Sequence, residues 1–138
     1  MTHRSWIHIT LCAALACTGL SALAQNYPTK PITMVVPFPP GGVADTVGRP
    51  VAEAMSRHLK QSIVVENKGG AGGGIGMAQV AKSKGDGYTV LMSLSSLVVL
   101  PEADKILQRP PMFQVNQLKP IARFTADPTV LVVRSDSP

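Results

Sequence analysis

Two adjacent glycines, Gly41 and Gly42, follow a proline-rich segment in a pattern that could bind a small anion. Three of the residues 37–40 are prolines, which lack a backbone donor and fix φ, so the chain is stiff there. The glycines then allow backbone angles and close approaches that a side chain would forbid. A helical pattern begins at Val43, which places free N–H groups and a positive dipole end beside the glycines. This combination predicts a socket for a small anion.

Asp45 lies in the expected first turn of this helix and admits two interpretations. It could cap N–H groups there, because the helix dipole favours an acid at this end. It could instead face the ligand, where it would order a water molecule or accept from an ammonium or hydroxyl group. The residue types alone do not decide between these roles.

Two further loops contain residues suited to holding a ligand. The segment 69–76 has six glycines in eight residues and follows a predicted strand, and Ser93 and Ser95 follow another. Tight turns that need positive φ would also explain the glycines. We favour the functional role, because ligands of parallel α/β sheets bind where the carboxyl ends of the strands meet.

Nucleotide binding, catalysis and metal binding have little support in the sequence. The strict G-x-G-x-x-G spacing fails, because Ile75 occupies its sixth position when Gly70 is the first. The Gly-Lys-Ser/Thr of a P-loop and the Gly-x-Ser-x-Gly elbow of a serine hydrolase do not occur. His58 is the only histidine after residue 24, and a solvated helix position explains it. Since the acids are also spread singly, we predict no catalytic residue, no cofactor and no metal site.

Apolar periodicity predicts alternating strands and helices. We expect strands at 32–36, 63–65, 88–92, 118–125 and 129–133 and helices at 43–59 and 75–82. Pro50 either kinks the first helix or leaves its first turn irregular. Asp45 and Arg49 fall on a helix face that we expect to be solvated, and 97–107 could be strand or helix. The alternation predicts an α/β fold with a mainly parallel sheet.

The first 24 residues are typical of a secretory signal peptide. Arg4 supplies positive charge, residues 6–20 are mostly apolar, and Ala-Leu-Ala precedes Gln25, so we expect cleavage after Ala24. Polar residues interrupt the apolar stretch, which argues against a transmembrane anchor. A lipid anchor at Cys17 is the less favoured alternative.

The remaining chain is mildly basic, because loss of Arg4 takes the formal charge from +5 to +4. Both cysteines, Cys12 and Cys17, lie in the expected leader. The basic residues are scattered, whereas nucleic-acid binding usually shows a clustered patch. Attraction of small acidic ligands fits this balance better. The chain stops five residues after the expected strand 129–133, which predicts truncation.

Several motifs in order along the chain resemble the Bug/TctC extracytoplasmic solute receptors, the substrate-binding proteins of tripartite tricarboxylate transporters. They are YPTKPI at 27–32, VVPFPPGG at 35–42 with Asp45, VVENKGGAGG at 64–73 with Ile75-Gly76, and DGYTVLM at 86–92. The similarity spans nearly all of 25–138.

The resemblance implies a periplasmic receptor whose two α/β lobes, of the type II periplasmic-binding-protein-like kind, close on a small carboxylate. A dicarboxylate, a tricarboxylate, an acidic amino acid or an aromatic acid would fit. The receptor would act as a monomer and pass its ligand to membrane permease subunits. The implied ligand-binding residues are Phe38, Pro39, Pro40, Gly41, Gly42, Asp45, Ala71, Gly72, Gly73, Gly74, Ser93 and Ser95. The implied organisation is a signal peptide at 1–24, the first lobe at 25–125 and the start of the crossover at 126–138.

The sequence also departs from the family pattern. Lys60-Gln61-Ser62 stands where Gly-Gln-Pro is common, and Ser93-Leu94-Ser95 replaces a Gly-Thr-Ser type of sequence. Without a second lobe, we expect 25–138 alone to bind weakly or not at all. The alternatives are a nucleotide-dependent enzyme that uses the glycines between Gly70 and Gly76, and a gene fragment without function.

Overall fold

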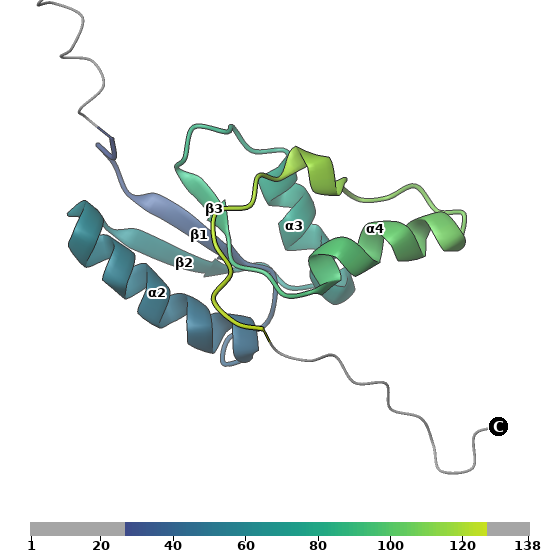
Figure 1. Ribbon diagram of the computed structural model, residues 1–138, viewed down its shortest axis with the longest axis horizontal. Coiled ribbons are helices and arrows are strands. Elements are labelled where there is room, and N and C mark those ends of the chain that lie inside the picture. Colours follow the sequence, from purple (N-terminus) through teal and green to yellow (C-terminus); the bar gives the residue numbers. More distant parts are fainter. Residues whose placement is uncertain (1–26, 127–138) are drawn as a thin grey trace, which may run out of the picture.

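The computed structural model describes residues 27–126, which form a parallel three-stranded sheet with helices on both faces (Figure 1). The strand order is β2-β1-β3, with β1 at Ile32–Val36, β2 at Ile63–Asn67 and β3 at Thr89–Leu91. In the register, Val36 of β1 lies opposite Asn67 of β2. The expected α/β class and parallel sheet are confirmed. The predicted signal peptide and the predicted strand at 129–133 lie outside the described residues.

The central strand β1 is covered on both faces, as its apolar run predicts. Ile32, Met34, Val35 and Val36 are each at most 3% exposed. Met34 and Val36 pack in one cluster with Ala44 and Ala52 of helix α2 (Val43–Leu59). On the other side of the sheet, a second cluster joins Met77 and Ala78 of helix α3 (Gly74–Ala81) to Leu91 and Phe113. Burial of two apolar layers fixes the sheet between the helices.

Helix α2 is helical from Val43 through Pro50, so of the two alternatives for Pro50, a kink or an irregular first turn, the irregular first turn is wrong. Pro50 cannot donate to the Thr46 carbonyl, but both residues are exposed, so water can satisfy that carbonyl. The helix ends at Lys60, which adopts the left-handed conformation with φ 54°. Lysine therefore occupies the conformation that glycine usually supplies at a helix end.

Segment 97–107 proves to be mostly helical, within α4 (Ser96–Ile106). Two short 3₁₀ turns, η2 (Ala71–Gly73) and η3 (Val115–Gln117), complete the elements. The predicted strand at 118–125 is wrong, since 119–126 have no regular secondary structure. Apolar side chains there face solvent, with Ile121 84% exposed, because no strand of the described part pairs with this segment.

At the amino end of the sheet, exposed and half-buried side chains tie the start of the chain to the residues before β3. The Tyr27 hydroxyl donates to the Gly87 carbonyl over 2.6 Å, and the Thr29 N–H donates to the Tyr88 hydroxyl over 3.0 Å. The two tyrosine rings meet edge to face at 5.1 Å, and the Lys30 ammonium lies 4.3 Å from the Tyr88 ring centre. We call Tyr27, Thr29, Lys30 and Tyr88 the aromatic clamp.

Candidate functional site

Three loops meet at the opposite, carboxyl end of the sheet, where the strand arrows end in Figure 1. They are loop 1 (37–42) after β1, loop 2 (68–73) after β2 and loop 3 (92–95) after β3. Backbone bonds hold the start of loops 2 and 3 against β1, from Lys68 N–H to the Val36 carbonyl (2.8 Å) and from Met92 N–H to the Val35 carbonyl (2.9 Å). The expectation that the three loops share one edge is confirmed.

Each loop leads into a helix that starts without a side-chain cap. Gly42 precedes α2, Gly73 precedes α3 and Ser95 precedes α4, and none of the three makes a side-chain capping bond. The first N–H groups of a helix have no acceptor inside the helix. Three helix amino termini with their positive dipole ends therefore point toward one edge of the sheet.

Loop 1 has three exposed residues in a row. Pro39, Pro40 and Gly41 are exposed, and Phe38 and Gly42 are partly buried. Gly41 has φ +80°, a conformation that residues with side chains rarely adopt. Gly42 is extended at φ −75° and ψ 172°, and its N–H is 3.4 Å from the Pro39 carbonyl. The loop is thus a tight turn in which the exposed Gly41 carries no side chain.

Asp45 is buried beneath loop 1, at 3% exposure, so the expectation of a solvated position is wrong. Its Oδ2 accepts from the Gly41 N–H and from Arg49 Nε, both over 2.9 Å, and its Oδ1 accepts from Asn67 Nδ2 over 2.9 Å. These bonds, that from Arg49 first, hold the pKa of Asp45 well below its usual range. The carboxylate caps a loop N–H just before the helix, which favours the capping interpretation over direct contact with a ligand.

Asn67 bonds to both Asp45 and Arg49, and the sequence analysis did not predict a role for it. Its Nδ2 donates to the Phe38 carbonyl (3.1 Å) as well as to Asp45, and its Oδ1 accepts from Arg49 Nη2 (3.1 Å). The available signal was its place at the end of β2, opposite the last residue of β1. The i,i+4 spacing of Asp45 and Arg49 puts both side chains on one face of α2, where they form an ion pair at 2.9 Å. We call Asp45, Arg49 and Asn67 the loop-anchoring cluster.

The four predicted site residues at 71–74, in loop 2 and at the start of α3, differ in exposure. Ala71 and Gly72 are exposed, whereas Gly73 and Gly74 are buried. Gly73 has φ +98°, and a Cβ there would lie 3.1 Å from Cε1 of Phe38, so the two glycine-bearing loops touch at this point. In loop 3, Ser93 is partly buried and Ser95 is exposed. The structure thus places all the predicted site residues on or beside one edge.

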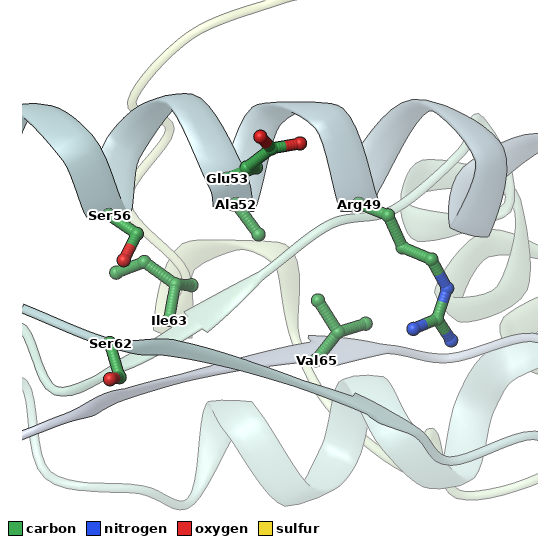
Figure 2. A pocket seen from close by; sticks show the side chains of 7 residues that line it. All are labelled: Arg49, Ala52, Glu53, Ser56, Ser62, Ile63 and Val65. Carbon is green, nitrogen blue, oxygen red and sulfur yellow. The ribbon is translucent and has the colours of Figure 1, made fainter.

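The surface of residues 27–126 has a hollow beside loop 2 and another one away from the three loops. One, of about 580 Å³, is formed by loop 2, α4 and the segment after it, and its lining is Ala71, Gly72, Gly74, Leu100, Asp104, Arg109, Pro110, Met112 and Phe113. The other, of about 390 Å³, is a groove between α2 and β2 (Figure 2), lined by Arg49, Ala52, Glu53, Ser56, Ser62, Ile63 and Val65. Only the first hollow contains predicted site residues.

Comparison with known proteins identifies the family. Residues 47–138 match the model of the tripartite tricarboxylate transporter family receptor, TctC. The chain belongs to this family. A UPF0065 protein of Bordetella pertussis is 40% identical over 126 residues, which cover 91% of this chain and 38% of that protein. Protein BugT of the same organism is 41% identical over 120 residues, covering 86% of this chain and 36% of BugT. The TctC chain therefore spans under two fifths of the length of these relatives.

Solved structures agree with the TctC assignment. One described as a periplasmic transporter is 41% identical with a TM-score of 0.59, over 64% of this chain and 29% of that structure. A TctC solute-binding protein from Polaromonas is 43% identical with a TM-score of 0.53, over 56% and 27% of the two chains. Both neighbours support the fold of a periplasmic binding protein. Among residues 27–126 of this TctC chain, no helix has the length and apolar character needed to cross a membrane.

Proposed function

We propose that this TctC-family chain supplies the first ligand-binding lobe, residues 25–125, of a periplasmic receptor for a small carboxylate. The receptor captures its ligand without chemical conversion and delivers it to the permease subunits of a tripartite tricarboxylate transporter. The family model and the relatives support this role. Residues 126–138 would begin the crossover to a second lobe.

The observation that carries the proposal is the meeting of three uncapped helix starts at the carboxyl end of the sheet. A carboxylate needs donors and a positive potential, and the positive dipole ends of the three helices supply the potential. In α3 and α4 the N–H groups of Gly74, Ile75, Leu97 and Val98 donate to carbonyls of the preceding loop, so the donors proposed for the ligand are the N–H groups of Val43 and Ala44 at the start of α2. Gly41 in loop 1 and Ala71 and Gly72 in loop 2 are exposed residues, and the hydroxyl of the exposed Ser95 offers a further donor. Ordered water can complete such a site without many charged side chains.

Within this proposal some of the predicted site residues line the ligand site, and others hold the loops in place. Pro39, Pro40 and Gly41, which are exposed, and the partly buried Gly42 line the ligand side of loop 1. Phe38 and Gly73 lie deeper and hold loops 1 and 2 together, whereas the buried Gly74 faces Leu100 and Met112. Asp45 acts through the loop that it anchors rather than by touching the carboxylate.

Calorimetry on the protein expressed from its natural gene tests the proposal. The ligands are succinate, citrate, glutamate and benzoate, with ATP and NAD as the competing class. We expect saturable heat with at least one carboxylate and none with either nucleotide. Heat with a nucleotide and none with any carboxylate would contradict the receptor proposal and favour a nucleotide-dependent enzyme.

Gly42→Val tests whether loop 1 is the site. A Cβ at Gly42 would lie 3.4 Å from the Pro39 carbonyl oxygen, and the backbone angles there suit any residue, so the fold should persist. The branched side chain would cover the N–H groups at the start of α2, and we expect affinity to fall at least about tenfold, or 1.4 kcal/mol. Gly85→Val is the control, because a Cβ at Gly85 meets nothing within 4 Å. Unchanged affinity in Gly42→Val would remove loop 1 from the site.

The proposed location has its own test. Amino-terminal sequencing of the protein from an osmotic-shock extract should give Gln25 as the first residue, as cleavage after Ala24 requires. A lipid-modified cysteine at position 17 would instead place the receptor on the membrane surface. Retention of Met1 in the cytoplasmic fraction would contradict export.

A further inference from the structure

We propose that Asn67 is a positioning residue, which sets the donor geometry of loop 1 by fastening that loop to the end of β2. This inference rests on the proposed carboxylate site but concerns a side chain outside the predicted ligand-binding set. Asn67 would not touch the ligand. It would act through the Phe38 carbonyl and the Asp45 carboxylate.

The contacts of Asn67 join three elements at one point. Its Nδ2 donates to the Phe38 carbonyl in loop 1 (3.1 Å) and to Asp45 Oδ1 on α2 (2.9 Å). Its Oδ1 accepts from Arg49 Nη2, one turn further along α2 (3.1 Å). Both amide hydrogens and one lone pair are thereby used. The residue itself is held by the sheet, because it pairs with Val36 at the end of β1.

The link from Asn67 to the donors of loop 1 runs through Asp45. Asp45 Oδ2 accepts the Gly41 N–H over 2.9 Å, which fixes the peptide plane before Gly41. Gly41 has φ +80°, and Gly42 forms the start of α2. The direction of the next N–H groups therefore depends on a chain of bonds from β2 through Asn67 and Asp45 to Gly41. Without it, loop 1 would keep its covalent path, but the N–H groups that follow it at the start of α2 would lose a fixed orientation.

Only an amide fits this position. Aspartate has the size of asparagine, but its carboxylate would have no hydrogens for the Phe38 carbonyl or for Asp45 and would place two carboxylates against each other. Leucine would leave the Asp45 oxygen and the Phe38 carbonyl without their donor. The position is also close to the second glycine loop, since Phe38 packs against Gly73. Asn67 is thus placed to set the spacing of loops 1 and 2 together.

The experiment compares Asn67→Ala and Asn67→Asp with Asn116→Ala, a matched change of an exposed asparagine in η3. Full-length protein from the natural gene is used, and affinity for the tightest of succinate, citrate, glutamate and benzoate is measured well below each variant's unfolding temperature. We expect both Asn67 variants to bind about tenfold more weakly, as loss of two or three hydrogen bonds allows, and Asn116→Ala to bind normally. Equal affinity in all three, with only a lower Tm for the Asn67 variants, would overturn the proposal.

A second readout does not depend on the ligand. Amide hydrogen exchange of Gly41 and Gly42 in the unliganded protein should speed up at least about fivefold in the Asn67 variants, whereas amides of β1 should be unchanged. If the wild-type protein binds none of the four acids, the proposed function fails while this exchange test still decides the role of Asn67. Unchanged exchange at both glycines would overturn the positioning role whatever the ligand. Unfolding of both Asn67 variants would also overturn it, because Asn67 would then be a general folding residue.

A double-mutant cycle locates the path of the effect. If Asn67 acts through Asp45, then Asp45→Asn combined with Asn67→Ala should weaken binding by less than the product of the two separate fold-changes. Effects that multiply independently would mean that Asn67 reaches loop 1 only through the Phe38 carbonyl, and would overturn the path through Asp45.

Discussion

The two ends of the parallel sheet differ in which groups lie at the surface. At the amino end, side chains do the holding: the aromatic clamp joins Tyr27, Thr29, Lys30 and Tyr88 at the surface. At the carboxyl end, the surface is glycine-rich main chain and the side chains that hold it are underneath. The difference teaches that an edge that binds a ligand through backbone N–H groups must leave them accessible. The side chains that hold its loops must therefore lie behind those loops.

Charge is distributed in the same way. The exposed Lys30 lies over the half-buried ring of Tyr88 at the amino end, where its interaction with solvent is largely kept. At the carboxyl end, Asp45 is buried and accepts three hydrogen bonds, so its carboxylate does not face an acidic ligand at the surface. Its ion pair with Arg49 offsets its negative charge close to the loops.

The largest effect should come from filling the space behind the carboxyl-end loops with Gly76→Val. Gly76 lies on α3, and a Cβ there would be 2.7 Å from the Lys68 carbonyl oxygen and 2.9 Å from Cβ of Pro37. Backbone must move to admit it, so we expect a loss of about 3 kcal/mol in the free energy of unfolding. Urea denaturation of this variant and of Gly85→Val measures the effect. A loss no larger than in Gly85→Val would show that these loops do not depend on close packing against α3.

A smaller, pH-dependent effect should come from the buried acid. Because the pKa of Asp45 is lower in the folded than in the unfolded protein, ionised Asp45 stabilises the fold above its unfolded value of about 4. This contribution is lost as the pH falls from about 4 toward the folded pKa. Thermal unfolding of wild type and Asp45→Asn between pH 7 and pH 2 should show a stability difference that shrinks with falling pH. A constant difference would mean that the charge of Asp45 is unimportant.

The sequence predicted the framework of the fold because its signals are local. The apolar run at 32–36 and the four-residue spacing from Val43 to Leu59 predicted β1 and α2, and both are present with those bounds. The α/β class followed from their alternation with later elements. Segment 118–125 misled the prediction, because its apolar residues suit a strand but the described part of the sheet provides no neighbour for it.

The candidate site could be predicted only in outline. Glycines and serines after strands indicated which edge to examine, and the structure brings those loops together. The supports could not be predicted in this way, because the bond from Asn67 to Phe38 joins residues 29 apart and that to Asp45 joins residues 22 apart. Asp45 was expected on a solvated face since helix periodicity describes the helix alone, whereas loop 1 and Asn67 bury it.

The smallest expected effect tests the amino end. Tyr27→Phe removes the hydroxyl that donates to the Gly87 carbonyl but keeps the ring that meets Tyr88. We expect the free energy of unfolding to fall by about 1 kcal/mol, which is typical of one hydrogen bond, and carboxylate affinity to stay unchanged. Urea denaturation and calorimetry on the same preparation measure both quantities. An affinity loss as large as that of Gly42→Val would mean that the aromatic clamp affects the ligand-binding loops at the far end of the sheet. The two ends would then not have separate roles in stability and in binding.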